Sequence, residues 1–430
     1  MSSVVVVGAQ WGDEAKAKVV DLLSCDSDIV VRSQGGNTAG HTVVVGRDKF
    51  ILHLIPCGVL RKGVVSIIGN GVVVDPKYFL EEMNDLRKRG VSVTPETLLI
   101  SERAHVIMPY HRLLDSLSEG LRAGAKIGTT GRGIGPCYAD KMSRTGIRIV
   151  DLLDEKTFRE RLEAVLVEKN VLLETLYKHE PLSADAIAKE YLAYAEQVRP
   201  FVCDTQGYLS RATAAKKRIL FEAAQGTLLD IDHGTYPFVT SSSAAVFGAC
   251  SGSGTSPKHI GKVIGVLKAY TTRVGAGPFP TELTEATGER LRESGQEFGA
   301  TTGRPRRCGW LDAVAGRYVA RLNAFDALAI TKIDVLTGIE KLLVCTAYRI
   351  DGKTTQEFPS RISALEAAKP VYEELPGWDQ DITKAQRLSD LPATTRAYLR
   401  RIEEIMSAPI EIVSIGPERE QTIRIGREKP

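Results

Sequence analysis

Residues 12–18, with the sequence GDEAKAK, combine acidic and basic side chains directly after a short apolar run. Residues 4–7 are four valines that Gly8 ends, and residues 14–23 have the apolar spacing of a helix. Where a strand leads into a helix, backbone N–H groups and the positive end of the helix dipole converge, and lysines there add positive charge for phosphate oxygens. The spacing is not that of a standard P-loop. The segment is therefore either a phosphate site of another kind or an ordinary turn with solvated lysines.

A second cluster, QGGNTAGHT at residues 34–42, places His41 among glycines, amides and hydroxyls. Glycines allow the backbone to approach a ligand closely, and histidine can transfer a proton near neutral pH. These residue types suit acid–base chemistry beside a bound ligand. The alternative is a loop whose histidine is incidental.

Three later loops carry residue types that bind phosphate and carboxylate. Residues 128–136 read GTTGRGIGP, and residues 225–240 follow another apolar run with Gln, Thr, Asp and His. Residues 299–307 read GATTGRPRR, and the planar guanidinium groups of arginine match carboxylate and phosphate with paired hydrogen bonds. We expect a phosphate monoester at the first loop and a dicarboxylate at the third. A plain glycine-rich loop and a solvated basic turn are the alternatives.

The sequence Thr331-Lys332-Ile333-Asp334 also follows an apolar run and is similar to the base-reading NKxD element of GTP-binding proteins, with Thr in the Asn position. An aspartate carboxylate can accept hydrogen bonds from both N1–H and the 2-amino group of guanine, whereas adenine offers no such pair of donors. The element favours GTP over ATP, although so short a string also occurs by chance.

The elements that must position these residues follow from the alternation of short apolar runs with helical or glycine-rich segments. This alternation predicts an α/β fold with a large, mainly parallel central sheet and flanking helices. Residues 155–197 contain no glycine and are rich in Leu, Glu, Lys and Ala, which predicts a helical insertion at about residues 151–215. No linker divides the chain, so we expect one large domain over residues 1–430. The runs expected as strands are 4–7, 29–31, 64–68, 98–100, 219–221, 263–267, 327–331, 342–347 and 410–413, with a further helix at 394–405.

Composition narrows the class of partner. The net charge is +3 over 430 residues without a long basic run, which suits small anionic ligands better than nucleic acid. The seven cysteines form no CxxC pair, which argues against a structural zinc site and a disulfide framework and favours a reducing compartment. No stretch reaches the roughly 18 apolar residues of a membrane span, and the N-terminal valine run is too short for a signal peptide. We expect a cytoplasmic protein with no membrane partner.

Taken in order, the motifs resemble those of the adenylosuccinate synthetase family, over residues 4–417. The resemblance implies a GTP-dependent carbon–nitrogen ligase of purine biosynthesis that couples IMP to L-aspartate and releases GDP and phosphate. It implies P-loop-NTPase-like handling of the nucleotide, one Mg²⁺ per subunit and a homodimer. The matching segments are QWGDE, QGGNTAGHT, IGTTGRGIGP, QGTLLDIDHGTYP, TTRVGAGPFPTEL, ATTGRPRR and TKID.

The resemblance implies three catalytic residues. Asp13 would take the N1 proton of IMP and would bind Mg²⁺ together with the backbone carbonyl of Gly40. His41 would be the general acid that donates toward the GTP phosphates. Gln225 would stabilise the 6-oxygen of IMP as it attacks the γ-phosphorus, and aspartate would then displace phosphate from 6-phosphoryl-IMP. Phosphorylation is needed because a purine carbonyl oxygen is a poor leaving group in water.

The resemblance also implies three overlapping sets of binding residues. GTP would contact Gly12, Asp13, Glu14, Ala15, Lys16, Ala17, Lys18, Gly40, His41, Thr42, Arg306, Lys332, Ile333, Asp334, Ser414, Ile415 and Gly416. IMP would contact Asp13, Lys16, Thr38, Ala39, Gly40, His41, Thr130, Gln225, Thr240 and Arg304, with Arg144 reaching the nucleotide of the neighbouring subunit. Aspartate would contact Ala300, Thr301, Thr302, Gly303 and Arg304.

The first loop departs from the family pattern GDEGKGK, because Ala15 and Ala17 replace both glycines. Alanine adds a methyl group where phosphates would lie and disfavours positive φ, but in helical backbone it is tolerated and helps the helix by about 1 kcal/mol or less. We expect helical backbone at both positions. Three further departures are Ala223 for Gly, Thr38 for Asn, and Ile415 for a smaller residue near the guanine site.

Three other functions stay open on the sequence. One is a GTP- and IMP-binding paralogue in which Ala15 and Ala17 impair catalysis. A sister ligase would use another purine, such as a 2-amino purine nucleotide, although Asp13 suits removal of the N1 proton of IMP. A signalling GTPase is suggested only by the TKID element.

Overall fold

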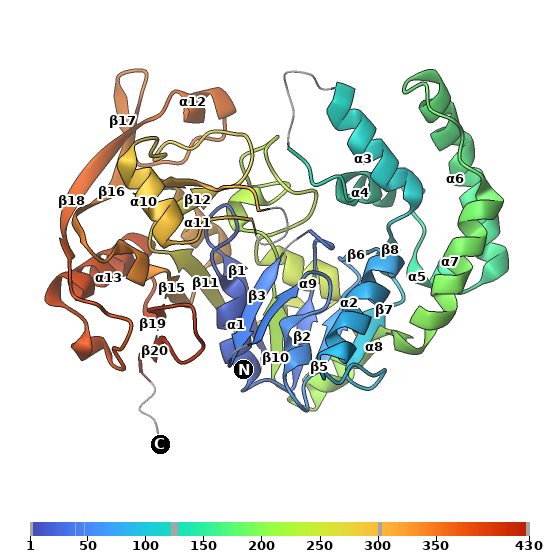
Figure 1. The fold of residues 1–430 in the computed structure, drawn as a ribbon, viewed down its shortest axis with the longest axis horizontal. Helices are drawn as coiled ribbons and strands as arrows, with labels where there is room; N and C mark the ends of the chain where they lie inside the picture. Colours follow the sequence, from blue (N-terminus) through green and yellow to red (C-terminus); the bar gives the residue numbers. More distant parts are fainter. Residues whose placement is uncertain (1–2, 39, 47, 122–127, 300–302, 427–430) are drawn as a thin grey trace.

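A ten-stranded sheet forms the centre of the protein (Figure 1). The computed structural model describes residues 3–38, 40–46, 48–121, 128–299 and 303–426. Within them, every strand pair of this sheet is parallel except β19–β20. In spatial order the strands are β20 (Thr422–Arg424), β19 (Ile410–Ser414), β15 (Ala327–Thr331), β11 (Lys262–Lys268), β1 (Ser3–Gly8), β10 (Ile219–Glu222), β2 (Ile29–Arg32), β5 (Val65–Ile68), β7 (Leu98–Ser101) and β9 (Val202–Cys203).

Both faces of the sheet are buried, which explains why its central strands are mainly apolar. Val5 and Val7 belong to one hydrophobic cluster, whereas Val6 belongs to another on the opposite face. Successive side chains of a strand point to opposite faces, so a strand covered on both sides needs an uninterrupted apolar run. The mainly parallel sheet predicted from these runs is confirmed.

Helices cover the two faces. Residues of α1 (Lys16–Ser24) and α2 (Pro76–Lys88) contribute to the cluster that contains Val6. Asp75 caps α2 by accepting from Tyr78 N at 3.2 Å, and Pro76 occupies its first turn, where no N–H is needed. The opposite cluster receives residues of α8 (Thr205–Ala214), α9 (Phe247–Ser253), α11 (Ala313–Asn323) and α13 (Ala393–Met406).

A group of helices lies to one side of the sheet, where Figure 1 draws them in cyan and green. Asp140 joins three of them: its carboxylate pairs with His111 Nε2 at 3.0 Å and with Lys169 Nζ at 2.6 Å, all three side chains being buried. These ion pairs hold in place the helix that contains Asp140, which directly follows the loop at residues 128–133. The elements are α3 (Pro109–Leu121), α4 (Ile134–Ser143), α5 (Ile149–Leu152), α6 (Glu155–Thr175) and α7 (Ala184–Val198).

The expectation for residues 342–347 was wrong in one respect: they form a strand, but outside the central sheet. They lie in β16 (Ile339–Ile350), which pairs antiparallel with β17 (Lys353–Thr355) and β18 (Lys369–Trp378), and parallel with β14 (Leu311–Asp312). An apolar run predicts a strand without specifying its partners. The other predicted strands all belong to the central sheet.

No helix among the described residues has the length and apolarity needed to cross a membrane.

His105 makes folding stability sensitive to pH. It lies in β8 (His105–Val106), where burial lowers its pKa to about 4, helped by the positive charges of Lys141 and Arg148. Because the folded pKa is below the ordinary value of 6.5, the unfolded chain binds the proton more tightly. The contribution of His105 to stability is therefore present above about pH 6.5 and is lost as the pH falls toward 4.

We predict that His105→Leu reduces the pH dependence of the free energy of unfolding, measured by urea denaturation between pH 7 and pH 4.5. His259→Leu is the matched control, because His259 is exposed. An unchanged slope in His105→Leu would contradict this assignment.

Candidate active site

The predicted motifs meet because parallel strands end at the same edge of a sheet. Ligands of open α/β sheets bind outside the carboxyl ends of the strands, particularly where neighbouring strands lead away in different directions. Strand β1 lies between β10 and β11, near the middle of the sheet. The segments that follow strand ends at this edge are 9–15, 33–38, 223–226, 332–334 and 415–416.

The carboxylate of Glu14 organises the first loop. It is fully buried and accepts from Gln10 N at 3.0 Å, Gly12 N at 2.9 Å and Lys16 Nζ at 2.6 Å. The Glu14 backbone carbonyl accepts from Thr331 Oγ1 at 2.8 Å, which joins this loop to the predicted base-reading element. Glu14 and Lys16 thus neutralise each other beneath the loop, and the backbone and Asp13 form its outer side.

The backbone at the two alanines differs from the expectation at one of them. Ala17 lies inside α1, is buried and has helical backbone, as expected. Ala15 precedes the helix with φ 60° and ψ 34°, in the left-handed region, so helical backbone at this position was a wrong prediction. The reversal of the chain that brings Glu14 beneath the loop also requires positive φ at Gly12 and Asp13. Ala15 therefore adopts the conformation that glycine would adopt, at a cost of about 1 kcal/mol.

Asp13 is held by an arginine from a distant loop. Arg306 Nε lies 2.9 Å from Asp13 Oδ2, and Arg306 Nη1 lies 2.7 Å from the buried carboxylate of Glu297. Burial raises the pKa of Glu297, but Lys268, Lys332 and Arg306 outweigh it and bring the pKa to about 2. Glu297 thus stays charged and orients Arg306 toward the first loop.

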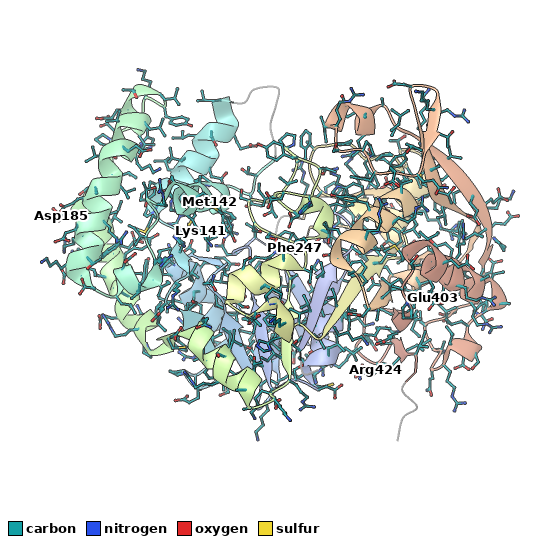
Figure 2. The ribbon with its side chains drawn as sticks, turned by 180° about the vertical axis from the view of Figure 1, so that it is seen from behind. Lys141, Met142, Asp185, Phe247, Glu403 and Arg424 are labelled. Carbon is teal, nitrogen blue, oxygen red and sulfur yellow. The ribbon has the colours of Figure 1, made fainter. Side chains whose placement is uncertain are left out.

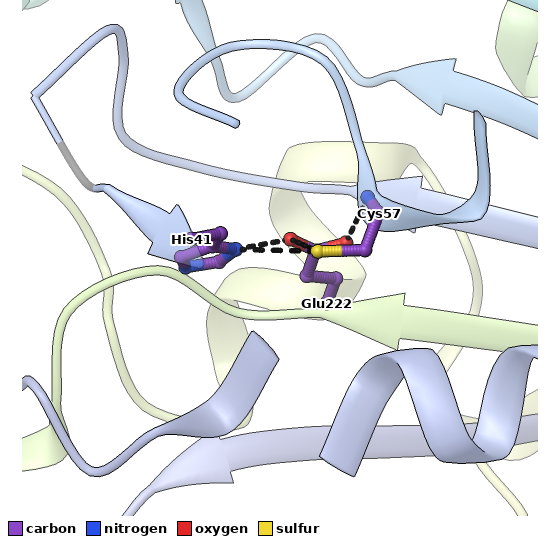
Figure 3. Close-up of side chains that lie close together, drawn as sticks. All are labelled: His41, Cys57 and Glu222. Carbon is purple, nitrogen blue, oxygen red and sulfur yellow. Dashed lines mark hydrogen bonds and ion pairs between the residues drawn. The ribbon is translucent and has the colours of Figure 1, made fainter. Parts of the chain in front are cut away.

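His41, which begins β3 (His41–Val45), is oriented by a buried glutamate (Figure 3). Glu222 Oε1 is hydrogen-bonded to His41 Nδ1, and Glu222 Oε2 accepts from Cys57 N at 2.8 Å. Burial lowers the pKa of His41, and the nearby carboxylate opposes that effect only in part. Since a carboxylate is an acceptor, Nδ1 carries the proton, which leaves Nε2 for a ligand.

Gln225 lies beside the second loop. Its backbone has φ 57°, and its Oε1 accepts from Gln34 Nε2 at 3.2 Å. Gln34 also exchanges two hydrogen bonds with the backbone of Ala224, at 2.9 and 3.1 Å. Gly35 has φ +83°, and a Cβ there would lie 3.2 Å from Gln225 Nε2, so only glycine fits easily. Ala223 does not have positive φ, so its replacement of glycine carries no backbone strain.

The Lys18 side chain is hydrogen-bonded to residues of the predicted guanine site. Its Nζ donates to Ser414 Oγ at 2.7 Å, Gly416 O at 2.6 Å and Gln421 O at 2.9 Å. Burial lowers the pKa of Lys18 to about 8, and the negative charge of Asp334 opposes the shift. Burial also raises the pKa of the half-buried Asp334.

Two predicted guanine contacts have side chains that belong to the core. Ile333 and Ile415 are fully buried in the hydrophobic cluster. Both side chains are therefore inaccessible, and either residue could contact a nucleotide only through its backbone. Lys332, with φ 61°, donates from Nζ to Gly295 O at 2.6 Å.

The remaining predicted residues lie in the loops around this edge. The 128–133 loop approaches Arg304, because a Cβ on Gly128 would lie 3.7 Å from Arg304 Nη1. Thr130, Gly303 and Arg304 are exposed. Thr38, Gly40, Thr42 and Thr240 are partly buried, whereas Ala39, Ala300, Thr301 and Thr302 lie outside the described residues.

Arg144 is exposed at the end of α4, with left-handed backbone at φ 68°. Among the described residues its side chain has no hydrogen bond or ion pair, so a single chain does not join it to the strand-end site.

Sequence reasoning missed the buried groups that hold the predicted ones. Glu222 and Glu297 each bond to a predicted catalytic or binding residue, and Gln34, which belongs to the predicted second cluster, was not given its role of holding Gln225. Arg32 was also missed: it is fully buried, and its Nε and Nη1 have no hydrogen-bond partner in the part of the chain that the structure describes. The sequence did contain a signal for Glu222 and Arg32, since each is a charged residue at the end of an otherwise apolar run. Glu297 offered none.

The family model described as adenylosuccinate synthetase matches residues 5–423. The chain belongs to the adenylosuccinate synthetase family. Adenylosuccinate synthetase of Carboxydothermus hydrogenoformans is 56% identical to the chain over 98% of it and 99% of the relative, and that of Geotalea daltonii is 53% identical over 99% of both. The chain is therefore a GTP-dependent ligase that couples IMP to aspartate.

Solved structures agree with this assignment. The fully ligated adenylosuccinate synthetase of Plasmodium falciparum has a TM-score of 0.92 at 38% identity, over 99% of this chain and all of that one. A cyanophage S-2L succinoaminodeoxyadenylate synthetase bound to dGMP and dATP has a TM-score of 0.60 at 18% identity, over 98% of this chain and 95% of that one. The second likeness shows only that the fold is shared.

The backbone of the first loop predicts opposite effects for the two alanines. Ala15→Gly should raise the free energy of unfolding by up to about 1 kcal/mol, because glycine adopts positive φ without steric cost. Ala17→Gly should lower it by about 1 kcal/mol or more, because glycine weakens a helix and the site is buried. Urea denaturation of both variants tests this, each serving as the control for the other.

The same variants test the loop in catalysis. Since Ala15 already has the conformation of glycine, we expect Ala15→Gly to leave turnover nearly unchanged. A sharp rise in turnover would instead support the impaired-paralogue hypothesis.

Proposed function

We propose that the chain is an active ligase in which Asp13, His41 and Gln225 carry out the chemistry at the carboxyl edge of the central sheet. The observation that supports this most directly is that each of the three is already held by other residues of this edge. Arg306 pairs with Asp13, Glu222 with His41, and Gln34 with Gln225. Side chains fixed in this way suit a reaction whose barrier is lowered by positioning and electrostatics.

In the first step, Asp13 takes the N1 proton of IMP. The electrons of that bond pass through the ring to the 6-oxygen, which attacks the γ-phosphorus of GTP, and the bond to the β-phosphate oxygen breaks to release GDP. Gln225 would donate its amide N–H to the 6-oxygen. His41 Nε2, with Nδ1 bonded to Glu222, would act toward the phosphates, where Arg306 adds positive charge.

In the second step, the amine of aspartate attacks C6 of 6-phosphoryl-IMP and phosphate leaves. Arg304, at the loop beside Gly128, would bind an aspartate carboxylate through paired hydrogen bonds. The proposal includes Thr301, Thr302 and Gly303 in the same loop. Thr38, Thr130 and Thr240 would hold the IMP phosphate, and Lys332 with Asp334 would read guanine.

Mg²⁺ fits the residues at the first loop. The proposed ligands, the Asp13 carboxylate and the Gly40 carbonyl, are both oxygens, and both residues are partly or fully exposed. An all-oxygen donor set with few protein ligands is typical of Mg²⁺ that also binds phosphates. When bound there, the ion would neutralise phosphate charge, and Asp13 Oδ1 could bind it while Oδ2 stays paired with Arg306.

We also propose that the active form is a homodimer in which Arg144 completes the neighbouring site. Apart from Arg144 itself, two exposed apolar side chains support a protein contact on this side: Met142, on α4, is 73% exposed and Phe247, at the start of α9, is 46% exposed (Figure 2). Apolar groups exposed near a charged functional residue are typical of interfaces. The seven unpaired cysteines support a reducing, cytoplasmic setting.

The competing functions differ in which substrates the reaction requires. An assay with GTP, IMP, aspartate and Mg²⁺ should release GDP and phosphate together with a change in purine absorbance, and omission of any one substrate should abolish it. GTP consumption without IMP would contradict the mechanism and favour a GTPase. Activity with dGMP in place of IMP would favour the sister ligase.

The proposed dimer predicts complementation between two defective variants. His41→Asn and Arg144→Leu should each be nearly inactive at subsaturating IMP. Random pairing of equal amounts gives half heterodimers, each with one intact site, so the mixture should recover about a quarter of wild-type activity.

Mixing His41→Asn with Asp13→Asn is the control. Each of these two residues would act in the site of its own subunit, so both sites of the mixed dimer carry a defect and the mixture should recover no activity. Absence of recovery with Arg144→Leu would contradict the shared site.

A further inference from the structure

His41, Cys57 and Glu222 form a buried cluster of three side chains of types that bind metals (Figure 3). Cys57 begins a short 3₁₀ helix, η1 (Cys57–Leu60), whose N-terminal residue packs against the end of β10. The proposed mechanism of the ligase reaction gives the thiol no task. We propose that a soft divalent cation such as Zn²⁺ binds to His41 Nδ1, Cys57 Sγ and Glu222 Oε1 and switches the enzyme off.

The geometry is close to that of such a site. Cys57 Sγ lies 3.9 Å from His41 Nδ1 and 3.3 Å from Glu222 Oε1, and the three ligand atoms lie within 4.8 Å of one another. Zinc bonds of about 2.0–2.3 Å at tetrahedral angles separate ligand atoms by roughly 3.3–3.6 Å. Only the hydrogen-bonded pair of His41 and Glu222 must move apart to admit the ion.

The charges balance when all three ligands take part. The Cys57 thiol loses its proton to solvent as the metal–sulfur bond forms, so a thiolate, a carboxylate and a neutral imidazole surround a doubly charged ion. The sum is zero in a site where each side chain is nine-tenths buried or more. Arg32 is fully buried near the cluster, and its positive charge would repel a metal site that carried a net positive charge. Loss of the thiolate would leave such a surplus, so Cys57 is essential to the site.

The ligand types separate this site from the proposed Mg²⁺ site. Thiolate and imidazole select zinc, cobalt or cadmium, whereas Mg²⁺ prefers oxygen ligands in an octahedral arrangement. The two ions would therefore bind at different places, and excess Mg²⁺ would not displace the soft cation.

The bound metal would inhibit the enzyme by changing the protonation of the His41 ring. This explanation of inhibition rests on the proposed function. A metal bond at Nδ1 displaces the proton that His41 now donates to Glu222, and that proton moves to Nε2, so the ring stays neutral. Releasing that proton would create an imidazolate, which is unfavourable, so a metal-bound His41 is a poor general acid. Cys57 and Glu222 are fully buried and His41 is 6% exposed, so the ion would enter past His41 when nucleotides are absent.

Binding can be measured without the reaction by adding Co²⁺ to the full-length protein in excess Mg²⁺. We expect a thiolate-to-cobalt charge-transfer absorbance that Zn²⁺ abolishes by displacement. Cys57→Ser should lose this absorbance and bind Co²⁺ more weakly by at least 10-fold. Loss of a residue that only hydrogen-bonds to a metal ligand already lowers metal affinity by about 10- to 100-fold, and Cys57 would be a ligand itself. Cys25→Ser, at the most exposed cysteine, is the control and should keep it. An unchanged absorbance in Cys57→Ser would overturn the site.

Inhibition is then measured in the three-substrate assay with Zn²⁺ at saturating Mg²⁺. Wild-type enzyme and Cys25→Ser should be inhibited, Cys57→Ser should resist by at least 10-fold, and prior addition of GTP and IMP should slow inhibition. Cobalt absorbance that depends on Cys57 without inhibition would overturn the switch but leave the metal site. If the ligase assay itself fails while the absorbance depends on Cys57, the proposed function is at fault and the metal site stands.

Discussion

Parallel strands that share a sheet must all end at the same edge, and the candidate active site depends on this constraint. Glu14 and Thr331 are 317 positions apart in sequence yet share a hydrogen bond, and Lys18 reaches Ser414 across 396 positions. The central strands are mainly apolar because both faces of the sheet are covered. Functional side chains are therefore confined to the strand ends, where backbone N–H groups and loops meet solvent.

Three fully buried glutamates support the functional side chains at this edge. Glu14 pairs with Lys16, Glu222 with His41, and Glu297 with Arg306, and each also bonds to other groups. A buried carboxylate is costly unless its lone pairs are satisfied, so each one tolerates few arrangements of its partners. The rigidity that suits the ligase reaction is thus provided from beneath the loops, while Asp13 stays partly exposed.

Departures from the family pattern have effects that depend on backbone conformation. Ala17 and Ala223 lie where alanine is unstrained, and the bulk of Ile415 is directed into the core. Ala15 alone takes a conformation that favours glycine. The loop nevertheless keeps its shape, because the bonds of Glu14 outweigh a strain of about 1 kcal/mol.

The sequence by itself determined the α/β class, most of the central strands, the long helices of the insertion and the family, because apolar periodicity and ordered motifs are local properties of the chain. Only the tertiary structure decided that residues 342–347 pair in a separate sheet, that Ala15 has positive φ, and that Glu222 lies against His41. Partner choice, backbone reversal and burial of charge all depend on contacts between distant segments. A local pattern such as the TKID element can suggest which base is read, but the bonds that hold it in place come from Glu14 and Gly295.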